Sequence, residues 1–90
     1  MYIEGYKRHI TVHTTDGIFE ALGKIPEVLK ELSAHGFIRT HQGFIVNMAY
    51  IKRFETTDVV LFDDTKVMIS VRKRPEALSL FDNYLRHRKW

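Results

Sequence analysis

The chain has 90 residues, of which 44% are hydrophobic and 28% charged, a composition typical of a folded globule rather than a disordered segment. It contains no cysteine, which excludes disulfides and thiolate-bound zinc, and its apolar runs are too short to span a bilayer. We expect one domain over residues 1–90, and the formal charge of +3 favours a polyanionic partner only weakly.

The first part of the chain predicts a β-hairpin preceded by a short strand. Residues 2–4 and 9–14 are rich in β-branched or aromatic side chains, which are typical of strands. Asp16-Gly17 is a strong hairpin signal, and residues 18–21 form the returning strand.

A short helix is predicted from Pro26 to Ala34. Pro26 lies in its first turn, and Gly36 is a natural stop. Its apolar residues recur at helical spacing: Ile25, Val28, Leu29 and Leu32.

The remaining sequence predicts a strand, a β-meander and a final helix. Residues 37–41 alternate apolar and polar side chains as a strand does, whereas residues 44–49 are interpreted as a buried turn or short helical stretch. The meander has three strands: residues 50–54, 59–62 and 66–70. Pro75 begins the last helix, and the polar tail 86–90 is expected to fray. The apolar face of that helix carries Leu78, Phe81, Tyr84 and Leu85. The fold class is therefore mainly β, with antiparallel sheets and two short helices.

The sequence lacks catalytic and metal-binding constellations. His9 and His13 are four residues apart in a strand, which separates them by about 13 Å, too far to share one ion. No Gly-flanked serine nucleophile and no Gly-rich phosphate loop is present. We therefore predict no metal, no cofactor, no small-molecule substrate and no enzymatic activity.

The placement of the basic residues says more about a partner than the net charge does. Residues 71–90 contain six basic and two acidic side chains, and shorter basic clusters occur at 7–9, 39–41 and 52–53. Such clusters can converge on a phosphate backbone, although solvated surface charge explains each cluster equally well. Gln42, in a Gly-containing turn, and Arg72, beyond the last strand, are residue types that pair with adenine and guanine.

The order of these motifs resembles that of LytTR domains, the DNA-binding output domains of bacterial response regulators. The central signature of that family is Phe-x-Arg-x-His, then a turn and Val-Asn, and residues 36–47 are similar to it. The other similar segments are residues 2–4, residues 7–14 with Asp16-Gly17, residues 29–32, residues 51–53, residues 63–65 and residues 69–74. The resemblance covers residues 2–88.

The resemblance implies an elongated stack of small antiparallel sheets whose loops, rather than a recognition helix, contact double-stranded DNA. Two loops enter successive major grooves, and a third element crosses between them. Mapped onto this sequence, the base contacts are His9, Gln42 and Arg72. The residues that contact phosphates or orient the base readers are Lys7, Arg8, Arg39, His41, Lys73 and Arg74. Asn47 is expected to bond backbone in its turn.

The resemblance also implies transcription regulation in the bacterial cytoplasm, with binding to promoter direct repeats as a homodimer, and a receiver domain that these residues do not include. Two departures from the family weaken backbone affinity rather than the fold. Gly43 stands where serine is common, which removes a hydroxyl–phosphate bond and frees the turn, and Thr57-Asp58 places an acid where a base would help.

Two other functions remain open on sequence alone. A basic β-rich domain of this size also fits a protein- or peptide-interaction module that uses an open sheet edge. Binding of single-stranded RNA is less favoured, because the aromatic residues follow the periodicity of a core rather than forming an exposed stacking pair.

Overall fold

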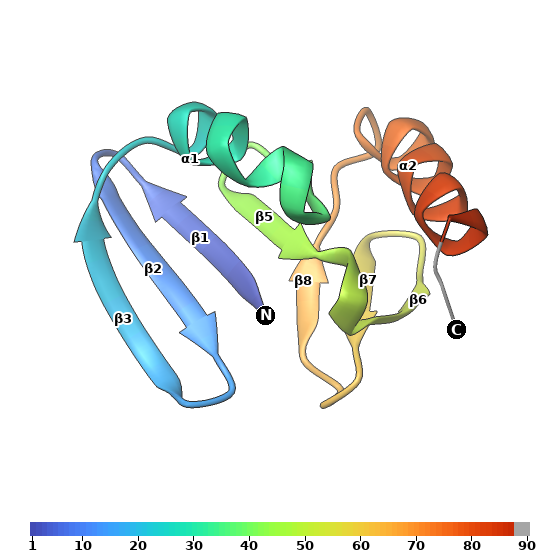
Figure 1. Cartoon of the computed structure of the whole chain (residues 1–90), viewed down its shortest axis with the longest axis horizontal. Coiled ribbons are helices and arrows are strands. Elements are labelled where there is room, and N and C mark those ends of the chain that lie inside the picture. The colour runs from blue at the N-terminus through green and yellow to red at the C-terminus, as the bar shows by residue number, and fades with distance from the viewer. Residues whose placement is uncertain (88–90) are drawn as a thin grey trace.

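Two antiparallel sheets and two α-helices make up the part of the chain that the computed structural model describes, residues 1–87 (Figure 1). The five-stranded sheet has the order β3-β2-β1-β5-β4, and the three-stranded sheet has the order β6-β7-β8. The extents are 34 × 29 × 25 Å, so the stack is only mildly elongated. The predicted fold class, mainly β with antiparallel sheets and two short helices, is confirmed.

The strands of the larger sheet are β1 (Tyr2–Tyr6), β2 (His9–Thr14), β3 (Gly17–Leu22), β4 (Phe37–His41) and β5 (Phe44–Asn47). Those of the smaller sheet are β6 (Ile51–Phe54), β7 (Asp58–Leu61) and β8 (Lys66–Met68). The helices are α1 (Ile25–Leu32) and α2 (Arg74–Arg86), with short 3₁₀ turns at Ser33–His35 and Met48–Tyr50.

The larger sheet has a core on each face. On one face α1 packs against β1, β2 and β5, around Ile3, Ile10, Ile25 and Ile45. The predicted apolar stripe of α1 is confirmed, since Val28, Leu29 and Leu32 pack against this cluster. On the other face Ile38 and Val46 join the core of the smaller sheet and α2. The larger sheet is therefore the middle layer of the molecule.

The interpretation of residues 44–49 as a turn or helical stretch is wrong for its first part, because Phe44–Asn47 forms strand β5. β5 lies between β1 and β4, and its neighbouring residues Ile45 and Val46 are both fully buried, on opposite faces. A strand covered on both sides shows no alternation of apolar and polar residues, so its sequence does not distinguish it from a buried helix.

The apolar face predicted for the last helix is shifted by the structure. Ala77 is the buried residue of α2, and Phe81 and Tyr84 pack beside it, whereas Leu85 is 43% exposed. The rings of Phe81 and Phe54 pack at a tilt of 47° with centroids 5.4 Å apart, which joins α2 to the smaller sheet. Of the predicted tail, Arg86 is helical, and residues 88–90 lie outside the described residues.

Candidate nucleic-acid interface

Three loops meet at one edge of the molecule: the β1–β2 turn, the β4–β5 turn and the loop between β8 and α2 (Figure 1). They border two adjoining surface grooves of about 480 and 420 Å³. Polar and charged side chains in the first groove are Tyr6, Lys7, Lys24, Arg39, His41 and Gln42. Those in the second are Arg39, His41, Gln42, Ser70, Arg72 and Lys73. Because the grooves share residues 39, 41 and 42, the β4–β5 turn lies between the other two loops.

The β4–β5 turn is braced by hydrogen bonds from its own side chains. Arg39 donates from Nε to the carbonyl of His41 (3.3 Å) and from Nη2 to the carbonyl of Gln42 (2.8 Å). The backbone N–H of Gly43 donates to Nδ1 of His41 (3.1 Å), so a neutral His41 carries its proton on Nε2. The carbonyl of Gly43 also accepts from the N–H of Gly5 on β1 (2.8 Å). The turn is thus held in place on both sides.

Gln42 differs from its neighbours in this turn. Its side chain is exposed, and no hydrogen bond within residues 1–87 engages its amide. A rigid turn that leaves one amide group free can offer both its donor and its acceptor to an external partner. This is the arrangement that bidentate pairing with adenine requires.

The β1–β2 turn carries exposed cations on a strained backbone. Lys7 has φ of 57°, in the left-handed region, and its Nζ lies 5.5 Å from the ring centroid of Tyr6. Arg8 and His9 follow and are exposed. His9 is the first residue of β2 and lines neither of the two grooves, whereas Lys7 lines the first.

The three basic residues of the loop between β8 and α2 lie in different surroundings. Arg72 is exposed and Lys73 half-buried, and both line the second groove. Arg74 instead donates from Nε to the carbonyl of Glu55 (3.2 Å), which directs its guanidinium toward the β6–β7 connection.

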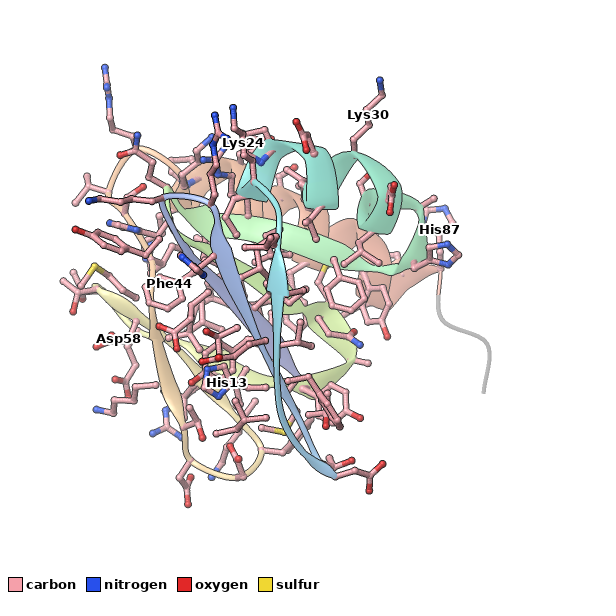
Figure 2. All side chains as sticks on the ribbon, turned by 90° about the vertical axis from the view of Figure 1, so that its left-hand side faces the viewer. His13, Lys24, Lys30, Phe44, Asp58 and His87 are labelled. Atoms are coloured by element: carbon pink, nitrogen blue, oxygen red, sulfur yellow. The ribbon has the colours of Figure 1, made fainter. Side chains whose placement is uncertain are left out.

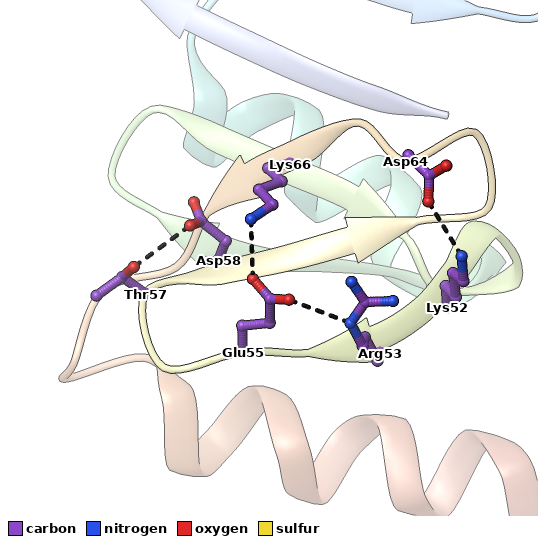
Figure 3. Close-up of polar contacts among 7 residues, drawn as sticks. All are labelled: Lys52, Arg53, Glu55, Thr57, Asp58, Asp64 and Lys66. Carbon is purple, nitrogen blue, oxygen red and sulfur yellow. Dashed lines mark hydrogen bonds and ion pairs between the residues drawn. The ribbon is translucent and has the colours of Figure 1, made fainter.

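Ion pairs engage the basic residues of the smaller sheet (Figure 3). Lys52 pairs with Asp64 (3.0 Å), while Arg53 and Lys66 both pair with Glu55 (3.1 and 3.2 Å). Hydrogen bonds from Lys66 and Arg53 lower the pKa of Glu55, so this carboxylate stays ionised at neutral pH. The predicted basic cluster at residues 52–53 is therefore engaged in ion pairs within the smaller sheet.

The cations in and beside the two grooves have no such partners. Within residues 1–87 no ion pair involves Lys7, Arg8, Lys24, Arg39, Arg72 or Lys73. Figure 2 shows nitrogen-tipped side chains gathered around Lys24 along the upper edge, above His13 and Asp58. Unpaired positive charge around two grooves favours a polyanion over an apolar or basic surface.

Comparison with known protein families matches residues 1–82 to the LytTR DNA-binding domain. The chain belongs to the LytTR DNA-binding domain family. The match spans all three loops, and DNA binding in transcription regulation is accordingly its function. The LytTR family is one of DNA-binding domains, not of enzymes. No curated protein matches the chain.

The structure of this LytTR domain brings most of the predicted site residues together. Around the two grooves lie Lys7, Arg39, His41, Gln42, Arg72 and Lys73. Arg8 borders a neighbouring hollow of about 340 Å³ with Lys24 and Glu27. His9 and Arg74 border none of these three surfaces.

Lys24 is the cation of this LytTR surface that sequence reasoning missed. It precedes α1 in an extended conformation, is exposed, and lines both the first groove and the hollow beside Arg8. In the sequence Lys24 is an isolated cation between a strand and a helix, so it belongs to no basic cluster. Its place before Pro26 at a helix start was the only available signal.

The predicted role of Asn47 as a turn residue agrees with the geometry, since its side chain accepts a hydrogen bond from the N–H of Ala49 (3.0 Å). Among residues 1–87 no group of three or more His, Asp or Glu side chains is arranged to hold a metal ion. Neither helix in the described part of the chain is long and apolar enough to cross a membrane.

Proposed function

We propose that this LytTR domain recognises specific sequences of double-stranded DNA by placing the β4–β5 turn and the β8–α2 loop in the major groove. Gln42 and Arg72 read base edges, and His9 is a third base contact at the edge of the β1–β2 turn. The observation that supports this most is that Gln42 and Arg72 line one groove, both exposed, among cations without ion pairs. A major groove about 12 Å wide admits such loops as readily as a helix.

The phosphate contacts follow from the unpaired cations. We assign Lys7, Arg8, Lys24 and Lys73 to phosphates on either side of the reading loops. Arg39 and His41 brace the turn that carries Gln42, and both also line the two grooves, where they can contact phosphate. For Arg74, which was predicted to contact phosphate, we propose instead a structural role, because its guanidinium bonds the Glu55 carbonyl.

Selection of bound duplexes from a random pool tests the proposal directly. We expect enrichment of a defined sequence. If the four assigned cations and Arg39 displace counterions, log K should fall with log salt with a slope of about −4.5. Recovery of unenriched duplexes would overturn sequence recognition. No retention of any duplex at low salt would instead favour a protein-interaction module, for which the open edge strand β3, with Ile18, Phe19 and Leu22 exposed, is the available surface.

We further propose that the domain acts as a response-regulator output domain, with two copies on promoter direct repeats and its loops in successive major grooves. The support is the family, whose architecture uses loops rather than a helix for contact. Titration of duplexes that carry one or two copies of the selected sequence measures this. A two-copy site should bind two protein chains, and equal stoichiometry on both duplexes would contradict it.

Replacing Lys24 by alanine should weaken binding to all duplexes alike. Loss of one phosphate contact lowers the magnitude of the salt slope by about 0.9 and leaves the ratio of specific to non-specific affinity unchanged. Fluorescence anisotropy at several salt concentrations measures both quantities. Lys52→Ala is the matched control, because Lys52 is paired with Asp64 on the other sheet and should leave the slope as it is.

Two substitutions of Lys7 distinguish the role of its charge from the strain of its positive φ. Lys7→Gly and Lys7→Ala should both lose one phosphate contact, but the glycine variant should be more stable than the alanine variant by about 1 kcal/mol. The reason is that glycine adopts φ of 57° without a Cβ clash. Urea unfolding measures the difference, and equal stability would mean that the turn relaxes to negative φ.

A further inference from the structure

Thr40 is the one polar residue that is fully buried among residues 1–87, and it lies where the two sheets meet. Its side chain donates from Oγ1 to the carbonyl of Met68 at the end of β8 (2.9 Å). Its own carbonyl accepts from the backbone N–H of Ser70 (2.8 Å). Two hydrogen bonds therefore tie β4 of the larger sheet to the segment that leaves the smaller sheet.

The junction formed by Thr40 and Ser70 lies equally close in sequence to the two loops that carry the proposed base readers. Gln42 follows Thr40 by two residues, and Arg72 follows Ser70 by two residues. Each proposed base reader thus stands at the same short distance along the chain from one half of the junction. A residue of extended chain spans at most about 3.5 Å, so neither reader can move far while the junction holds.

Both short connections are themselves restrained. On the first side Arg39 bonds the carbonyls of His41 and Gln42. On the second side the N–H of Lys73 donates to Oγ of Ser70 (3.1 Å), and the N–H of Arg74 donates to the Ser70 carbonyl (3.0 Å). The contact between Thr40 and Ser70 therefore restrains the distance between Gln42 and Arg72, because no flexible chain lies between the contact and either reader.

We propose that Thr40 is a positioning residue that sets the distance between Gln42 and Arg72, and hence the number of base pairs between the bases they read. This inference rests on the proposed function. If Thr40 had a purely structural role, replacing it would lower the stability of the domain and weaken binding to all duplexes alike. If Thr40 has a positioning role, replacing it should instead remove the preference of the domain for one spacing between the recognised bases.

The test compares duplexes with and without one base pair inserted between the bases read by Gln42 and by Arg72. The bases are located from the positions at which Gln42→Ala and Arg72→Ala lose discrimination in the selected duplex. The insertion should cost the wild-type domain about tenfold or more in affinity, because one reader then meets the wrong base. For Thr40→Val, which keeps the branched shape and removes the hydroxyl, we expect the penalty to fall below about threefold.

Three further variants separate positioning from stability. Thr40→Ser keeps the hydroxyl and should restore the spacing penalty. Val59→Ala, in the core of β7, is destabilised without touching the junction and should keep the full penalty. In an Arg72→Ala background Thr40→Val should cause no further change in the spacing penalty, because Gln42 is then the one remaining reader of the pair that Thr40 links.

The outcomes divide clearly. A folded Thr40→Val domain with an unchanged spacing penalty would overturn the positioning role alone. Failure of the wild-type domain to select any sequence would instead overturn the proposed function. If Thr40→Val does not fold, Thr40→Ala replaces it, since the smaller side chain leaves room for water at the Met68 carbonyl.

Discussion

Gln42→Ala and Arg72→Ala should each weaken binding to the selected duplex by about 5- to 150-fold, equivalent to about 1–3 kcal/mol, and relax discrimination at one base. Gln42 extends from a braced turn, and its amide is free of hydrogen bonds within the described residues. Arg72 is equally exposed, with no ion pair in residues 1–87 to compete for its guanidinium. Binding isotherms on the selected duplex and on its single-base variants measure both effects.

Arg53→Ala is the matched control for Arg72→Ala. Arg53 is also an exposed arginine, but it pairs with Glu55 and lines neither of the two grooves. Its loss should leave affinity and discrimination unchanged. If Arg53→Ala weakened binding as much as Arg72→Ala, or if neither reader variant altered discrimination, the reading loops would have been assigned incorrectly.

Gly5→Ala should destabilise the fold by about 1–3 kcal/mol, because it overpacks the contact between β1 and α1. A Cβ at Gly5 would lie 2.5 Å from Cγ1 of Ile25 and 2.9 Å from its Cδ1, and Ile25 is buried. The melting temperature should fall by about 4–8 °C for each kcal/mol in a domain of this size. Thermal unfolding followed by circular dichroism measures the loss.

A double-mutant cycle tests the cause of that loss. In an Ile25→Ala background the obstructing side chain is gone, so Gly5→Ala should cost clearly less than it does in the wild-type chain. Additive costs would show that the strain arises elsewhere, for example at the hydrogen bond from Gly5 to the Gly43 carbonyl.

The sequence predicted those elements of the fold whose pattern of side chains is local, and it missed those that depend on neighbouring elements. Strands β2 and β4 were predicted with their observed bounds, because each alternates its side chains between a covered and a less covered face. The apolar stripe of α1 was confirmed for the same reason. Strand β5 was missed because it is buried on both faces, a property of its neighbours rather than of its own residues.

The residues of the candidate site also divide into those that the sequence indicated and those that only the fold revealed. The residue types at Gln42 and Arg72 and the order of motifs around them indicated a LytTR domain before any geometry was known. The sequence did not indicate Lys24, because this lysine stands alone between a strand and a helix. It lines the first groove because β3 ends beside the β1–β2 turn, where the N–H of Gly23 donates to the Arg8 carbonyl. Conversely, residues 52–53 looked like a basic cluster, and only the fold showed their pairing with Asp64 and Glu55.

The sequence by itself therefore determined the family and the mainly β class, and it indicated the loops that carry the proposed base readers, because these depend on residue types and short-range periodicity. The tertiary structure decided which cations remain unpaired, that Gln42 and Arg72 line one groove, and that Thr40 joins the loops that carry them. The partners of Thr40 at Met68 and Ser70 lie 28 residues or more along the chain. Contacts over such distances arise only when the two sheets pack, so no local pattern in the sequence reports them.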